Sequence, residues 1–279
     1  MKKTKIAICY DFDLSLTPKN TEEFGLFADL GYTAEEFYAM VRQFIVENNS
    51  DIILTNMLML IEKAKEKNII LTKEKLREYG KKVEFFNGVE TWFERINEFG
   101  KNLGIEIEHY IVSSGQKEII AGTSIAKYIK KIYAASYFYN EKGEPVWPKI
   151  AINSTNKMQF LYRVNKGCLE ESDDGINNLI DGEQRNVPFE NMIYIGDSLT
   201  DIPCMRLVMK KGGKAIGVYN EDVNKNYLKS LLENNKIDFI AQADYSKNSM
   251  LEVIVKEIIK SDKINTNLKN LTRLQKKHV

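Results

Sequence analysis

An alternation of apolar segments with helical segments, which begins after Gly88, constrains the fold more than any other feature of this chain. Strands alternating with helices pair in parallel, with helices on both faces of one sheet. The sequence therefore predicts a doubly wound, mostly parallel, Rossmann-like α/β sheet. Helices are expected at 88–99, 116–129, 155–167, 200–213 and 249–260, strands at 107–115, 191–198, 214–219 and 238–245, and a β-hairpin at 132–153 that turns near Lys142 and Gly143.

Residues 18–86 have a different pattern, because they are helical throughout and nothing in them reads as a strand. Helices are predicted at 32–49, 51–68 and 71–80, with a capping box from Thr33 to Glu36 and with Asp51 and Thr72 as N-caps. The predicted division is an α/β core, 1–17 and 87–279, with an inserted all-helical domain, 18–86. Ligands of doubly wound sheets lie beyond the carboxyl ends of the strands, so the insertion is expected to cover that edge.

The first predicted strand, which includes Lys5 to Tyr10, ends abruptly in Asp11 and Asp13. At this spacing in an extended chain both carboxylates lean to the same side. Two neighbouring negative charges repel each other unless a positive group lies between them. Asp is also a common turn residue, but the pair favours a bound metal ion over a simple turn.

Other predicted segments carry polar side chains at the same edge of the sheet. The segment "YIVSSG" ends in Ser113, Ser114 and Gly115, "YIGDSLTD" contains Asp197 and Asp201, and the helix at 155–167 begins near Lys157. A metal held by carboxylates, together with a hydroxyl, backbone N–H donors and a lysine, can hold and transfer a phosphoryl group. A nucleotide kinase is disfavoured because no Gly-rich loop ending in GK[ST] is present.

These segments together resemble the four motifs of the haloacid dehalogenase (HAD) superfamily of aspartyl-phosphate hydrolases. The segment "DFDLSLT" looks like motif I, Ser113 like motif II, Lys157 like motif III, and "GDSLTD" like motif IV. The helical insertion resembles the C1-type cap of phosphoserine-phosphatase-like members. One departure is that Leu14 and Ser15 stand where the family often has Gly-Thr, although Ser15 keeps the hydroxyl.

The resemblance implies a Mg²⁺-dependent phosphatase that acts on a small phosphorylated metabolite. Asp11 is expected to be the nucleophile and Asp13 the general acid and base. Mg²⁺ is expected to be held by the carboxylates of Asp11 and Asp197 and the backbone carbonyl of Asp13, with Asp201 orienting its surroundings or binding through water. The phosphate is expected to contact the Lys157 ammonium, the Ser113 hydroxyl and the N–H groups of Ser114 and Gly115.

Several alternatives stay open at the level of sequence. Lys166 rivals Lys157 as the phosphate-binding lysine, and Ser113 with Ser114 could simply cap a helix. The same fold could carry a phosphotransferase or another C1-cap hydrolase, although Asp13 argues against C–X cleavage. The chain could also be a catalytically weak regulator that binds a phosphorylated metabolite.

Composition narrows the class of partner. Lys and Arg number 40 against 39 Asp and Glu, so no net field attracts nucleic acid or an anionic membrane. The three cysteines form no disulfide or zinc pattern, and no apolar segment reaches membrane length. We therefore expect a soluble, cytoplasmic protein whose partner is a small phosphate ester, with the basic tail at 267–279 as a solvated helix or a frayed end.

Overall fold

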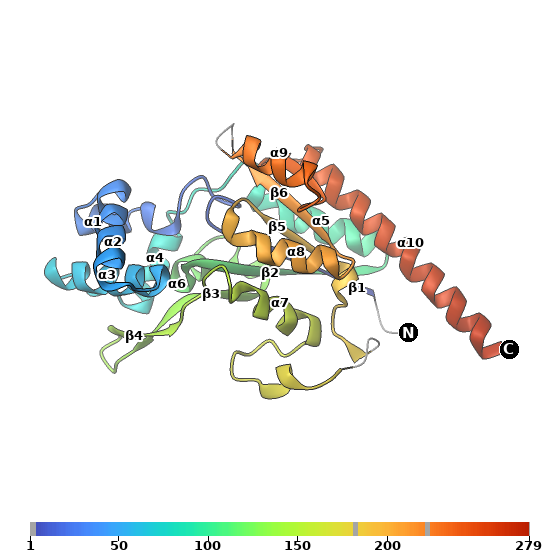
Figure 1. Cartoon of the computed structure of the whole chain (residues 1–279), viewed down its shortest axis with the longest axis horizontal. Coiled ribbons are helices and arrows are strands. Elements are labelled where there is room, and N and C mark those ends of the chain that lie inside the picture. Colours follow the sequence, from blue (N-terminus) through green and yellow to red (C-terminus); the bar gives the residue numbers. More distant parts are fainter. Residues whose placement is uncertain (1–3, 181–183, 221–223, 279) are drawn as a thin grey trace.

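A computed structural model describes residues 4–180, 184–220 and 224–278 of the chain, and its centre is a seven-stranded sheet (Figure 1). The strand order is β4-β3-β2-β1-β5-β6-β7, and every neighbouring pair is parallel except β3 with β4. The predicted doubly wound, mostly parallel sheet is therefore confirmed. The strands are β1 (Thr4–Tyr10), β2 (Ile105–Gln116), β3 (Ile129–Tyr139), β4 (Pro145–Ile150), β5 (Met192–Gly196), β6 (Lys214–Tyr219) and β7 (Phe239–Gln242).

Helices cover both faces of this sheet. Side chains alternate along β1, so Ile6, Ile8 and Tyr10 pack on one face while Ala7 and Cys9 pack on the other. The core against Ile8 includes residues of α5 (Val89–Asn102) and α10 (Met250–His278). The core against Cys9 includes residues of α7 (Lys157–Lys166), α8 (Ile202–Lys210) and α9 (Lys225–Glu233).

Residues between β1 and α5 form only helical elements, as predicted, and gather beside α6 at one end of the molecule (Figure 1). The N-cap side chains of Thr33, Asp51 and Thr72 accept backbone hydrogen bonds, and the Thr33–Glu36 capping box is present. All three predicted caps are therefore confirmed. These elements are the 3₁₀-helix η1 (Thr21–Glu23), α1 (Leu26–Leu30), α2 (Ala34–Asn48), α3 (Ile52–Glu66) and α4 (Lys73–Gly80).

The helix predicted over 116–129 is wrong in its second half. The helix α6 spans only Lys117–Ala121, a 3₁₀-helix η2 follows at Ala126–Tyr128, and residue 129 already starts β3. A β-carbon on Gly122 would lie 2.1 Å from the carbonyl oxygen of Arg77, so α4 approaches the backbone closely where the helix ends. This contact joins segments distant in the sequence, and helical periodicity carries no sign of it.

The other comparisons with the sequence predictions concern the β-hairpin and the last two helices. The predicted hairpin is present as β3 and β4, and Gly143 in its turn has a φ of 75°. The sequence pattern did not indicate α9, and α10 continues as far as His278, which agrees with the first of the two alternatives for the tail, a solvated helix. In Figure 1, α10 extends well beyond the end of the sheet. Among the described residues, no helix is both long enough and apolar enough to cross a membrane.

Candidate active site

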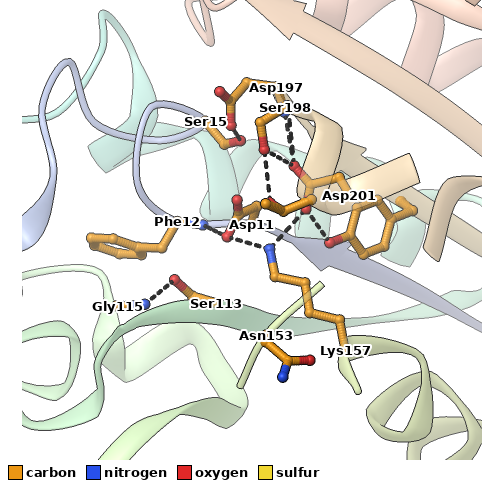
Figure 2. A network of polar contacts seen from close by, with 12 residues as sticks. Asp11, Phe12, Ser15, Ser113, Gly115, Asn153, Lys157, Asp197, Ser198 and Asp201 are labelled. Carbon is orange, nitrogen blue, oxygen red and sulfur yellow. Dashed lines mark hydrogen bonds and ion pairs between the residues drawn. The ribbon is translucent and has the colours of Figure 1, made fainter. Parts of the chain in front are cut away.

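Three carboxylates meet where β1 and β5 end. Asp11 follows β1, Asp197 follows β5, and Asp201 closes the 3₁₀-helix η6 (Leu199–Asp201). β1 and β5 are neighbours in the sheet, and the Asp11 backbone N–H donates to the Ile195 carbonyl. One oxygen from each carboxylate lies within 4.8 Å of the other two, and all three residues are buried. Figure 2 shows this convergence.

Asp201 is held by a complete set of donors. Its Oδ1 accepts from the Tyr194 hydroxyl at 2.7 Å and from Lys157 Nζ at 2.8 Å. Its Oδ2 accepts at 3.2 Å from the Asp197 N–H, the Ser198 N–H and the Ser198 hydroxyl. A β-carbon at Gly196 would lie 2.6 Å from this Oδ2, so glycine makes room for the carboxylate. These hydrogen bonds hold Lys157, Tyr194 and Ser198 in place around the Asp201 carboxylate.

Lys157 lies at the centre of the cluster. Its ammonium is 3.1 Å from Asp11 Oδ1 and 2.8 Å from Asp201 Oδ1, and the residue is fully buried. Burial alone would lower the pKa of Lys157, but the Asp11 and Asp201 carboxylates raise it above its usual value, so the ammonium stays charged. Lys166, its rival in the sequence, lies at the other end of α7 and donates to the carbonyls of Ile176 and Asn178.

The carboxylates outnumber the cations at this edge. Burial and the neighbouring negative charge of Asp201 raise the pKa of Asp11 to about 7. Burial, Asp11 and Asp201 raise the pKa of Asp197 to about 8. Burial, Glu22 and Asp11 raise the pKa of Asp13 well above its usual value. Of these neighbouring charged groups, only Lys157 is positive, so further positive charge would stabilise the ionised carboxylates.

The free oxygens fit a divalent metal ion. Asp11 Oδ1 accepts from the Phe12 N–H and lies beside Lys157, and Asp197 Oδ1 accepts from the Ser15 hydroxyl at 2.9 Å. Within the described residues, the Oδ2 atoms of Asp11 and Asp197 accept no hydrogen bond. Two free carboxylate oxygens in a buried, negatively charged cluster are ligands that a hard cation prefers.

Asp13 and the end of β2 form the other side of the site. Asp13 Oδ1 accepts from the Thr21 N–H at 2.8 Å, which ties the carboxylate to the start of the helical segment. A β-carbon at Gly115 would lie 2.5 Å from Asp13 Oδ2, so glycine allows this approach. The Ser113 hydroxyl accepts from the Gly115 N–H at 3.0 Å, and Figure 2 draws both residues beside Asp11 and Phe12.

A cavity of about 310 Å³ joins the strand ends to the helical segment. Asp13, Ser114 and Gly115, which the sequence analysis named as candidate site residues, contribute to one wall. Residues that the sequence analysis did not identify line the rest. They share no motif, because only the packing of η1, α2 and α3 over the sheet brings them here. They are Asn20, Glu22, Tyr38, Val41, Arg42, Ile52, Ile53 and Asn56.

The loop after Asp13 contains a leucine in a backbone conformation that is unusual for this residue type. Leu14 has a φ of 60°, in the left-handed region that favours glycine. Its neighbour Ser15 is fully buried, donates to Asp197, and has a carbonyl that accepts from the Tyr245 hydroxyl at 2.8 Å. These contacts hold Ser15 in place, so the turn keeps its shape although Leu replaces the glycine common in the resembled family.

Solved structures of HAD-family hydrolases and phosphoserine phosphatases share this fold. A phosphoserine phosphatase in the apo form gives a TM-score of 0.55 at 17% identity, covering 90% of this chain and 98% of that one. A phospho-aspartyl intermediate analogue of phosphoserine phosphatase gives 0.53 at 18% identity, over 91% and 99%. A HAD family hydrolase from Salmonella enterica serovar Typhi gives 0.54 at 16% identity, over 86% and 68%. At these identities the similarity establishes the fold, and the predicted HAD-like architecture is confirmed.

One relative found by sequence similarity covers most of this chain, but its description names no activity. A protein of Borreliella burgdorferi, described as uncharacterized, is 28% identical over 273 residues, which span 88% of this chain and 93% of that protein. No protein-family model matches the chain. The assignment of a reaction therefore depends on the geometry of the site.

Proposed function

We propose that the protein is a Mg²⁺-dependent phosphatase that hydrolyses a small phosphorylated metabolite through a phospho-aspartate on Asp11. The observation that carries this proposal is the state of Asp11. One of its carboxylate oxygens is held by Lys157 and the Phe12 N–H, while the other has no hydrogen-bond partner in the described residues. Such a carboxylate is oriented, and its two oxygens together keep lone pairs for both a metal ion and an attack on phosphorus.

In the first step, an Asp11 oxygen bonds to phosphorus as the bond from phosphorus to the leaving oxygen breaks. Asp13 gives its proton to that oxygen, which leaves as an alcohol. The raised pKa of Asp13 supports this role, because a general acid must hold a proton near neutral pH. In the second step, Asp13 takes a proton from water as the water oxygen attacks the phospho-aspartate, which releases phosphate and restores Asp11.

The groups proposed to hold the phosphate come from two elements, α7 and the end of β2. Lys157 places positive charge beside Asp11, while the Ser113 hydroxyl and the Ser114 N–H are proposed to donate to phosphate oxygens, and the Gly115 N–H would join them by giving up its bond to Ser113. The carboxylates of Asp11 and Asp197 and the carbonyl of Asp13 would hold Mg²⁺. When bound, the ion would offset the charge that the phosphate brings to this acidic cluster.

The helical segment is proposed to act as a cap, with domain limits of 18–86 for the cap and 1–17 with 87–279 for the core. Its support is the cavity that α2 and α3 share with the strand ends, which is about 310 Å³ and suits a small leaving group. Closure over the site would exclude bulk water from the phospho-aspartate. We also propose a cytoplasmic location, where the buried thiols of Cys9, Cys168 and Cys204 would stay reduced.

The test is a screen for release of inorganic phosphate from phosphorylated amino acids, sugars, amino alcohols and nucleotides, with and without Mg²⁺. We expect Mg²⁺-dependent release from at least one of these esters and little from a folded phosphoprotein. Release from no ester, with tight binding of one, would instead identify a regulator. Transfer of the phosphoryl group to a second metabolite in place of water would identify a phosphotransferase. Faster hydrolysis of the phosphoprotein than of every metabolite would contradict the capped site.

A further inference from the structure

A second cavity, of about 640 Å³, lies at the opposite edge of the sheet from the candidate active site. Its lining includes Lys214 and Phe239, the first residues of β6 and β7, and Asn191, which directly precedes β5. These are the amino ends of parallel strands, whereas the candidate active site lies beyond the carboxyl ends. The helix α10 completes the wall before it extends past the sheet (Figure 1). The two cavities are therefore separate.

One carboxylate in this cavity has no partner. Asp262 of α10 lines the cavity and is only 9% exposed, yet no hydrogen bond or ion pair reaches it from the described residues. Burial raises the pKa of Asp262 to about 7, although Lys214 and Lys269 counter part of that effect. The carboxylate oxygens of Asp262 are open to the cavity, so a donor that enters there can reach an acceptor with no partner in the described chain.

The other charged side chains of the wall are already paired. Lys214 contacts Asp238 at 3.1 Å, Lys269 contacts Glu190 at 2.9 Å, and Glu257 contacts Lys260 at 2.6 Å. Lys214 and Lys269, the cations among the described lining residues, are thus held by other acids, and Glu257 has its own cation. Among the described lining residues, Asp262 is therefore the charged side chain that has no ion-pair partner.

The remaining wall is largely apolar. Phe239, Val253, Ile254, Ile258 and Leu268 line the cavity around Asp262. A metal ion does not suit such a wall, because hard cations need several oxygen ligands and Asp262 is the one unpaired carboxylate among the described lining residues. A ligand with an apolar body and one positively charged donor would satisfy both the walls and the carboxylate.

We propose that this cavity is a binding site for a small organic monocation, an amine whose ammonium donates to Asp262 and whose hydrocarbon part packs against α10 and the start of β7. The hydrocarbon part gains from burial against the apolar side chains. The charged hydrogen bond provides selectivity over a neutral ligand of the same shape, because it satisfies a carboxylate that is otherwise unpaired. This site requires no assumption about the reaction at Asp11.

Calorimetric titration with two ring compounds of matched shape tests the proposal. Cyclohexylmethylamine carries the ammonium and cyclohexylmethanol does not, and at about pH 8 both the ammonium and the ionised Asp262 are present. We expect the amine to bind about tenfold more tightly than the alcohol, as a charged hydrogen bond predicts. Asp262→Asn should remove that preference, because the amide has nearly the same shape and no charge. Glu257→Gln is the matched control, which should leave the preference unchanged.

Three results would overturn the proposal. These are no binding of cyclohexylmethylamine, equal binding of amine and alcohol to the unaltered protein, or a preference that survives Asp262→Asn. If Asp262→Asn does not fold, a crystal structure of the unaltered protein soaked with cyclohexylmethylamine decides the question. The ammonium must then lie within hydrogen-bond distance of Asp262, and density elsewhere, or none, refutes the site.

Discussion

Two clusters of buried charge lie on the sheet and behave in opposite ways. Glu108 of β2 accepts from Lys5 at 2.8 Å and also from Lys130 and the Tyr110 hydroxyl. Burial alone would raise the pKa of Glu108, but these hydrogen bonds lower it below its usual value. At the carboxyl end of the sheet, several carboxylates share one lysine, and the pKa values of Asp11 and Asp197 are raised to about 7 and about 8.

We interpret the difference as a structural role for the Glu108 cluster and a proposed ligand-binding role for the Asp11 cluster. The Glu108 cluster is balanced by its own chain, so it stabilises the fold and needs no ligand. The Asp11 cluster is stable at full ionisation only when positive charge is added, which a metal ion would provide. Buried acids as such are therefore weak evidence of function, and unbalanced buried acids are stronger evidence.

The most direct test of this comparison is to remove one carboxylate from each cluster. Asp11→Asn keeps the shape of the side chain and removes the nucleophilic charge, so phosphate release should fall at least about a thousandfold. Glu108→Gln is the matched control and should leave the rate within about threefold. Steady-state release of phosphate measures both. A fall of less than about tenfold in Asp11→Asn would exclude Asp11 as the nucleophile.

Removal of the Lys157 side chain should have the next largest effect on catalysis. Lys157→Ala deletes the one ammonium beside Asp11 and should lower kcat/KM about a hundredfold, as loss of one preorganised electrostatic contact does. Lys166→Ala is the control on the same helix, and its effect on catalysis should be small because its ammonium binds backbone carbonyls. The reverse ranking would move the phosphate-binding role to Lys166.

A change in the Glu108 cluster should affect the stability of the fold, and not the rate of phosphate release. Glu108→Gln leaves the Lys5 and Lys130 ammonium groups without a carboxylate, and we expect a loss of about 1–3 kcal/mol in the free energy of unfolding. Urea denaturation followed by circular dichroism measures it. Asp197→Asn should not destabilise the metal-free protein, because it removes a carboxylate that burial disfavours. Destabilisation by Asp197→Asn larger than that by Glu108→Gln would reverse the assignment of roles.

The two clusters should also respond to pH with opposite signs. The pKa of Glu108 is lowered by folding, so its stabilisation is present above its unfolded pKa and is lost as pH falls through the lower folded value. Asp11 and Asp197 have raised pKa values, so the metal-free protein should lose stability as pH rises from about 4 through about 8. Saturating Mg²⁺ should reverse this loss, and its affinity should rise with pH because its ligands must be deprotonated.

Melting temperatures measured across this range, with and without Mg²⁺, provide the test. Asp197→Asn should flatten the metal-free dependence at neutral pH, whereas Glu108→Gln should change it only at acidic pH. An affinity for Mg²⁺ that does not change between about pH 6 and pH 8 would contradict binding at these carboxylates.

The smallest expected effect concerns the turn between the two site aspartates and the buried Ser15. Leu14→Gly should relieve the left-handed strain, worth about 1–2 kcal/mol, but glycine also loses about 0.5–1 kcal/mol of conformational entropy on folding. We therefore expect stabilisation of about 1 kcal/mol or less, seen as a small rise in melting temperature. Clear destabilisation would mean that the half-exposed Leu14 side chain makes a contact that outweighs the strain.

Much of the site was predictable because its residues follow strands in the sequence. Asp11 and Asp197 come directly after apolar runs, and parallel strands bring such residues to one edge. The choice between Lys157 and Lys166 was not predictable, because both lie on α7 and only the direction of that helix decides which one reaches Asp11. The helix expected over 116–129 failed for a related reason, since close packing of α4 at Gly122 interrupts it.

The sequence by itself therefore determined most of the strands and helices, the helix caps and the acidic residues at the strand ends, because local periodicity and short motifs encode them. Only the tertiary structure decided what surrounds those residues. Packing of the helical segment over the sheet brings Glu22 of η1 and Arg42 of α2 to the Asp13 cavity, and α10 places Asp262 among apolar side chains. Burial and pairing of charge arise between segments far apart in the chain, so no local pattern can report them.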